Sequence, residues 1–163
     1  MYPFGTGAVG DQQVAKSDDG YVGIATAVPF SLYGVAYTSL YASMNGYVSF
    51  GAAIPDWVGC SWFPTGPNCS GFPTASLAAG APVAAAWYAD ADTEAIVAPP
   101  SPLPVGYPTN ALPNSMYLRK STSSTDKAHM ASDVAAAFST AFSPAEILVV
   151  TWFVPATAKP PLV

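Results

Sequence analysis

The first third of the chain shows short runs in which aromatic and β-branched residues alternate with small or polar ones. This period-two pattern is typical of half-buried β-strands. The runs extend from Tyr21 to Phe50 and are interrupted at Gly23, Pro29 and Gly34, three residues that commonly mark turns or bulges. We therefore predict several short strands in this region.

A hairpin is predicted near the end of the same region. Asn45-Gly46 is the preferred pair for a type I′ turn, and it separates the apolar runs 37–44 and 47–50. A two-residue turn fixes the register of the two strands, and the register fixes which side chains share a face. In this register one face of the hairpin carries Tyr41, Ser43, Val48 and Phe50.

Three later segments also predict strands. The runs 82–89 and 145–154 are largely apolar, as expected of buried strands, and the run 115–121 is a shorter candidate. The segment 52–81 contains four prolines and both cysteines and is predicted to be a loop.

One amphipathic helix is predicted near residues 126–142. Apolar side chains recur there at every fourth position, and Pro144 would prevent the helix from continuing. We expect this stripe to pack on a sheet; its members are Met130, Val134, Phe138 and Phe142, widened by Ala137 and Ala141.

The resulting fold class is mainly β, with two packed antiparallel layers in a sandwich-like arrangement and one helix across a face. Prolines concentrate in two other places. Residues 98–114 contain six prolines and are predicted to be a surface insertion of polyproline type, with a site for a proline-recognising partner as the alternative. Residues 155–163 form a proline-rich tail.

Composition narrows the classes of function. Apolar residues make up 51% of the chain and charged residues 9%, which predicts a well-filled core and a largely neutral surface. The net charge is −5, and five basic residues are too few for the positive surface of a nucleic-acid-binding protein. No apolar run reaches the length of a membrane span, so we predict no membrane insertion by this chain.

Cys60 and Cys69 lie in a Gly/Pro/Ser-rich segment and are predicted to form a disulfide. Such a bond would stabilise the fold by roughly 2–3 kcal/mol and would require an oxidising compartment. The alternative is a pair of free buried thiols. Asn68 begins the sequon Asn68-Cys69-Ser70, so it is a candidate for N-glycosylation.

The order of short motifs resembles the nidogen-like (NIDO) extracellular domain of basement-membrane nidogen, tectorin-type and membrane-mucin-type proteins. The resemblance covers residues 2 to about 154. It depends on Tyr2-Pro-Phe-Gly5, Gly10-Asp11, Ser17-Asp-Asp-Gly20, Val28-Pro-Phe30, Tyr33-Gly34, Tyr37-Thr-Ser-Leu-Tyr41, Asn45-Gly46, Ser49-Phe50-Gly51, Trp87-Tyr-Ala-Asp-Ala-Asp-Thr93, Tyr117-Leu-Arg119 and Val150-Thr-Trp152.

The resemblance implies a domain over residues 1–154 that is secreted or belongs to the ectodomain of a larger protein. Its function would be non-enzymatic: structure or adhesion in a matrix, cell wall or cell surface, with proteins or glycans as partners. Two departures from the family pattern are the proline-rich insertion and the missing strands after residue 154, which make the domain look truncated at its C-terminal end.

Most of the acidic residues fall in two short segments that the family pattern places beside strand ends. If these segments meet, their carboxylates offer the hard oxygen ligands that calcium requires. The alternative is that the carboxylates accept backbone N–H bonds in turns, and then no cofactor is needed. The candidate calcium ligands are Asp11, Asp18, Asp19, Asp90 and Asp92.

Two other functions remain as alternatives. Exposed Trp57 and Trp62 in the long loop would suit a carbohydrate-binding module. More remotely, Asp90 and Asp92 would serve as the carboxylate pair of a glycoside hydrolase. We predict that the chain is not an enzyme, because its single histidine has no Gly-x-Ser-x-Gly nucleophile motif to act with.

Overall fold

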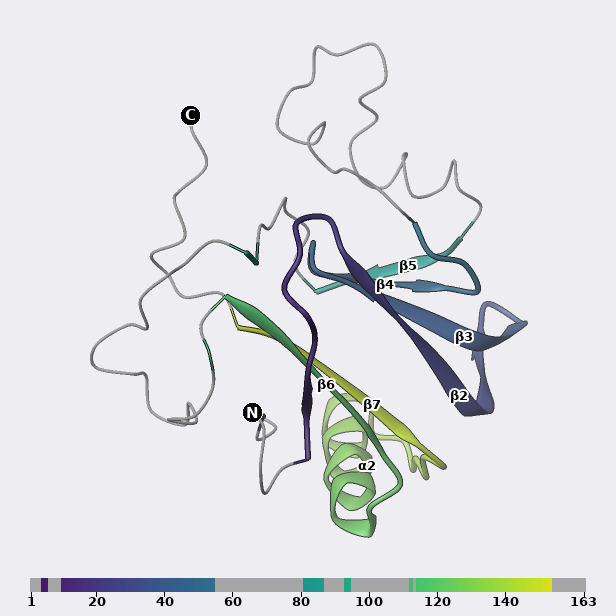
Figure 1. Cartoon of the computed structure of the whole chain (residues 1–163). Helices are drawn as coiled ribbons and strands as arrows, with labels where there is room; N and C mark the ends of the chain where they lie inside the picture. Colours follow the sequence, from purple (N-terminus) through teal and green to yellow (C-terminus); the bar gives the residue numbers. More distant parts are fainter. Residues whose placement is uncertain are drawn as a thin grey trace, which may run out of the picture.

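In the residues that it describes, the computed structural model contains two antiparallel β-sheets and one helix, α2 (Figure 1). The structure describes residues 4–5, 10–54, 81–86, 93–94, 112 and 114–153. The two sheets pack against each other through apolar side chains. The mainly β, sandwich-like fold with a single helix that the sequence predicts is confirmed for this part of the chain.

The four-stranded sheet has the order β2-β3-β4-β5, so its strands are neighbours in chain order. The strands are β2 (Tyr21–Leu32), β3 (Val35–Ser43), β4 (Tyr47–Phe50) and β5 (Val83–Ala85). β5 is a short edge strand with half-buried to exposed residues. The sequence predicts a buried strand over 82–89. A strand is present at β5, but it is not buried, because nothing in the described part of the chain covers its outer side.

The type I′ turn lies between β2 and β3. Leu32 pairs with Val35, and the two residues between them have positive φ angles of 51° at Tyr33 and 81° at Gly34. Positive φ at both central positions defines this turn, whose twist matches that of the flanking strands. Tyrosine is unusual in such a conformation, since a Cβ atom clashes with the backbone there.

The β3–β4 connection differs from its prediction by one residue. Ala42 pairs with Val48 and Leu40 with Phe50, so the loop has three residues and not two. Gly46 has a φ of +83°, whereas Asn45 is absent from the residues with positive φ, which excludes a type I′ turn. A type I turn followed by a left-handed glycine is the usual three-residue solution. The predicted shared face of Tyr41, Ser43, Val48 and Phe50 is wrong, because a one-residue shift reverses the faces.

β2 carries a large bulge. Ala25 pairs with Ser39 and Phe30 with Tyr37, so residues 26–29 of β2 oppose a single residue of β3. Pro29 lies within this bulge, where its missing N–H removes no hydrogen bond from the ladder. The bulge bends β2 toward the second sheet, where its backbone contacts side chains of other strands.

The three-stranded sheet has the order β1-β6-β7 and consists of β1 (Gln12–Gln13), β6 (Ser115–Ser121) and β7 (Ile147–Phe153). Strands over 115–121 and 145–154 were predicted and both are confirmed, the second slightly shorter. β7 is buried only at its ends, Ile147 and Phe153, and half-buried between them. Among the described residues no strand pairs with its outer edge.

The core lies between the two sheets. Its main cluster contains fully buried residues from β2, β3, β4 and β6 and the β3–β4 loop, and Val150 and Trp152 of β7 pack against them. The Trp152 indole N–H also donates a 2.7 Å hydrogen bond to the Ser43 carbonyl, which ties the sheets together. The cluster residues are Ile24, Leu40, Ala42, Met44, Phe50 and Met116.

The helix α2 spans Ser124–Phe138, two residues earlier at its start and four earlier at its end than predicted. Ser123 caps the start by accepting a hydrogen bond from the Asp126 backbone N–H. The helix ends at Ser139, which has a left-handed φ of 52°, well before Pro144. No helix residue is buried and Phe138 is 74% exposed. The predicted packing of the apolar stripe on a sheet is therefore only partial: Met130 and Val134 are half-buried and line a groove beside β7.

Candidate functional site

Asp11, one of the five proposed calcium ligands, lies in a buried ion pair. Its Oδ1 is 2.7 Å from Arg119 NH1 on β6, and its Oδ2 accepts a 2.8 Å hydrogen bond from the Gly5 backbone N–H. The side chains of Asp11 and Arg119 are 1% and 8% exposed. Arg119 Nε also lies 3.4 Å from Asp126 at the start of α2. The group thus joins the N-terminal segment, β6 and the helix.

Asp19 and Ser17 hold the first acidic segment against other parts of the fold. Asp19 accepts a 2.9 Å hydrogen bond from the side-chain amide of Asn45, and its own φ is +42°. The Ser17 backbone N–H donates to Thr93 Oγ1 at 2.8 Å, and Thr93 Oγ1 donates to the Ser17 carbonyl at 2.7 Å. Thr93 thus lies beside the first acidic segment. These contacts hold the first acidic segment in place, although the donor to Asp19 is a side-chain amide and not the backbone N–H of a turn.

Several predicted site residues lie outside the described residues. They are Asp90 and Asp92 of the calcium and glycosidase hypotheses, the disulfide pair Cys60 and Cys69, the sequon residue Asn68, and the aromatic pair Trp57 and Trp62. The disulfide, the glycosylation and the sugar-binding surface therefore stay predictions.

The described residues contain no group of three or more acidic, histidine or cysteine side chains that could hold a metal ion. Asp11 has both oxygens engaged, and Asp19 is bound by Asn45. Asp18, another proposed ligand, also has a partner in the fold. The remaining proposed ligands, Asp90 and Asp92, lie outside the described residues.

We expect the melting temperature to be the same in EDTA and in millimolar calcium, because the described carboxylates already have partners. The measurement is thermal unfolding followed by circular dichroism, with magnesium as a control for ionic strength. A ligand that binds only the folded state raises the melting temperature by mass action. A rise specific to calcium would contradict the turn-stabilising account and show that Asp90 and Asp92 complete a site.

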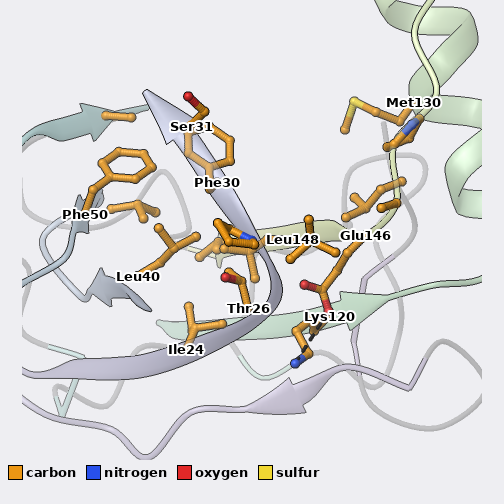
Figure 2. Close-up of a pocket in the computed structure, with 18 of the residues that line it drawn as sticks. Ile24, Thr26, Phe30, Ser31, Leu40, Phe50, Lys120, Met130, Glu146 and Leu148 are labelled. Carbon is orange, nitrogen blue, oxygen red and sulfur yellow. Dashed lines mark ion pairs between the residues drawn. The ribbon is translucent and has the colours of Figure 1, made fainter. Parts of the chain in front are cut away.

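A groove opens between the sheets on the side of β7 and α2 (Figure 2). Its volume is about 860 Å³, and every strand except β1 contributes to its lining, together with α2 and the segment 142–146. It lies at an edge of the three-stranded sheet, because β7 is the last strand in the order β1-β6-β7 among the described residues. The groove is lined mainly by apolar side chains, among them Leu40, Phe50, Leu148 and Val150.

Two charged side chains lie at this groove and connect the sheets. Lys120 Nζ donates a 3.0 Å hydrogen bond to the Ala25 carbonyl, and Glu146 Oε2 accepts one of 3.0 Å from the Ala27 N–H. Lys120 and Glu146 also form an ion pair with a 3.5 Å separation. Both backbone groups belong to β2 at its bulge, so the bulge has direct partners in the other sheet. Sequence analysis missed this pair, since the residues are 95 and 119 positions from their partners.

The β2–β3 hairpin ends in an exposed aromatic surface. Tyr33 is 94% exposed at the first position of the type I′ turn, and Val35 beside it is 52% exposed. Phe30, at the base of the turn, stacks on Phe50 with ring centroids 5.2 Å apart and is 45% exposed. Asparagine, aspartate and glycine are preferred at the Tyr33 position. The backbone therefore holds a large ring in solvent in a conformation that a tyrosine rarely adopts.

No protein-family model, curated protein or solved structure matches this chain. The resemblance to the nidogen-like domain therefore rests on the quoted motifs alone and remains a prediction.

Proposed function

We propose that this chain is a non-enzymatic structural or adhesion module of a matrix, cell-wall or cell-surface protein. The observation that carries the proposal is the exposed end of the β2–β3 hairpin, with Tyr33, Val35 and Phe30. Exposed aromatic and aliphatic surface marks contact sites in soluble proteins. Tyrosine suits such a site because its ring buries a large area at a small loss of conformational entropy.

The strain at Tyr33 strengthens this argument. A side chain with positive φ outside the glycine, asparagine and aspartate set costs of order 1–3 kcal/mol, and such strain concentrates at functional positions. Asparagine at this position would relieve the strain and keep the turn. A solvent-exposed tyrosine that contributes nothing to the core and strains the backbone is therefore best explained by a partner that contacts its ring.

The described ionic side chains have structural roles, which also fits a module without catalysis. Asp11 and Arg119 fix the N-terminal segment to β6, and Lys120 and Glu146 connect the two sheets. Charged side chains held in such pairs stabilise a scaffold by connecting segments that are distant in the sequence.

An extracellular location is part of the proposal and is supported by the predicted Cys60–Cys69 disulfide and the Asn68 sequon. Within the described part of the chain no helix is long and apolar enough to cross a membrane. The carbohydrate-binding alternative depends on Trp57 and Trp62, and glycoside hydrolysis on Asp90 and Asp92. No observation among the described residues favours either one.

Two assays test the proposal with protein produced under oxidising conditions. Beads coated with many copies of the chain should be retained on decellularised matrix, and excess soluble chain should release them. On a panel of glycoside and ester substrates, the wild-type chain should show no more turnover than the Asp90→Asn variant. Robust turnover that disappears in this variant would overturn the proposal in favour of an enzyme.

A further inference from the structure

The groove between the sheets has a continuous apolar body. Leu40, Val48 and Phe50 line it from the four-stranded sheet, and Leu148 and Val150 line it from the three-stranded sheet. Its volume of about 860 Å³ falls in the range of roughly 300–1,000 Å³ that is typical of small-molecule sites. An alkyl chain bound in this space would be removed from water on both sides of its axis. Each buried methylene would then contribute its favourable transfer free energy to binding.

The polar groups of the groove gather near the β2 bulge. Among the described residues, Lys120 and Glu146 are the charged members of the lining (Figure 2). Glu146 is 11% exposed, with Oε2 bound to the Ala27 N–H and Oε1 paired to Lys120. Lys120 is 44% exposed, and its ammonium group has three N–H donors, of which the Ala25 carbonyl and Glu146 occupy two. One donor remains for an anion.

Thr26 supplies a second polar group at the same place. Its Oγ1 is buried and has no hydrogen-bond partner within the part of the chain that the structure describes. Thr26 lies between Ala25 and Ala27, whose backbone groups bind Lys120 and Glu146. A buried hydroxyl without a partner is unfavourable by roughly 1–3 kcal/mol, and a ligand oxygen beside it would remove that penalty.

We propose that this groove binds a single-chain carboxylate amphiphile, such as a medium-chain fatty acid. The carboxylate contacts Lys120 and the Thr26 hydroxyl, and the alkyl chain lies between Leu148 and the side chains of Leu40 and Phe50. Charge complementarity selects the headgroup: Glu146 already has two partners, whereas Lys120 keeps an exposed donor. The groove shares Phe30 with the hairpin end, whereas Tyr33 and Val35 lie outside its lining. Variants of Lys120 and Ala84 therefore test the groove without changing the exposed tyrosine on which the adhesion proposal depends.

Isothermal titration of the full chain with octanoate, decanoate and dodecanoate, each below its micelle concentration, tests the apolar part. Each added methylene should lower the Kd about fourfold. Ala84 pairs with Val48 and lines the groove from the edge strand β5. Ala84→Trp should fill the groove and abolish binding, whereas Ala128→Trp, on an exposed position of α2 outside the groove, should have no effect.

Lys120→Met tests the headgroup. It should weaken decanoate binding by about ten- to a hundredfold, as expected for a lost hydrogen bond to a charged group, and leave 1-decanol binding unchanged. Decylammonium should bind more weakly than decanoate. A Kd independent of chain length, or equal binding by Ala84→Trp, would overturn the proposal. The proposal would also be overturned if decanoate failed to bind and the groove instead held a second copy of the chain or an apolar peptide. Ala84→Trp would then dissociate that dimer or peptide.

Discussion

Replacing Arg119 with methionine should lower the free energy of unfolding by about 3–5 kcal/mol. The change keeps most of the side-chain volume but removes the partner of Asp11, whose carboxylate is 1% exposed. An unpaired buried carboxylate is far more unfavourable than a buried ion pair, so the loss exceeds the net contribution of the pair. Urea unfolding followed by tryptophan fluorescence gives the free-energy difference.

The double variant Arg119→Met/Asp11→Asn is the matched control. Asparagine keeps an oxygen for the Gly5 N–H and removes the buried charge. The double variant should therefore be more stable than Arg119→Met alone, although it carries an additional substitution. A double variant that is less stable than Arg119→Met would show that the broken ion pair does not cause the loss of stability in the single variant.

The second large effect is expected at Met116. This residue is 0% exposed at the centre of the core, and Met116→Ala should reduce the free energy of unfolding by about 2–5 kcal/mol. Leu148→Ala should lower the free energy of unfolding by less than half that amount, because Leu148 is half-buried and already faces the open groove. The comparison is made by urea unfolding of both variants under the same conditions. Equal losses would mean that the groove is closed in solution.

The sequence predicts the strands and the two-layer fold well, because alternation and apolar runs depend on local burial. It predicts turn geometry less well. Asn45-Gly46 has the preferred composition for a type I′ turn, yet the structure forms that turn at Tyr33-Gly34. The pairing of β3 with both neighbours determines the register, and local composition at one loop does not reveal it.

The helix shows the same limit. The stripe from Met130 to Phe142 has the right spacing for a buried face, but Ser139 ends the helix before the stripe is complete. Met130, Val134 and Phe142 line the groove, whereas Phe138 is 74% exposed. The pattern therefore identifies the apolar side of the helix, but the predicted packing on a sheet is only partial. Periodicity indicates which side of a helix is apolar, but not how closely another layer approaches it.

The candidate sites were harder to predict because their residues come together only in the fold. Asp11 and Arg119 are 108 positions apart, so the sequence offered Asp11 as a calcium ligand and gave no sign of its ion pair. The exposed Tyr33 was visible in the sequence only as part of a motif. Its significance depends on a positive φ and on an exposed fraction, which no sequence pattern supplies.

The most direct test of the adhesion proposal is the retention of chain-coated beads on decellularised matrix with the variant Tyr33→Asn. Asparagine suits the left-handed position, so the variant should be as stable as the wild type or more stable. We expect retention to fall at least tenfold, while Phe138→Asn, which removes another exposed aromatic ring from the end of α2, should leave it unchanged. Undiminished retention by a folded Tyr33→Asn variant would contradict the assignment of the hairpin end as the adhesive surface.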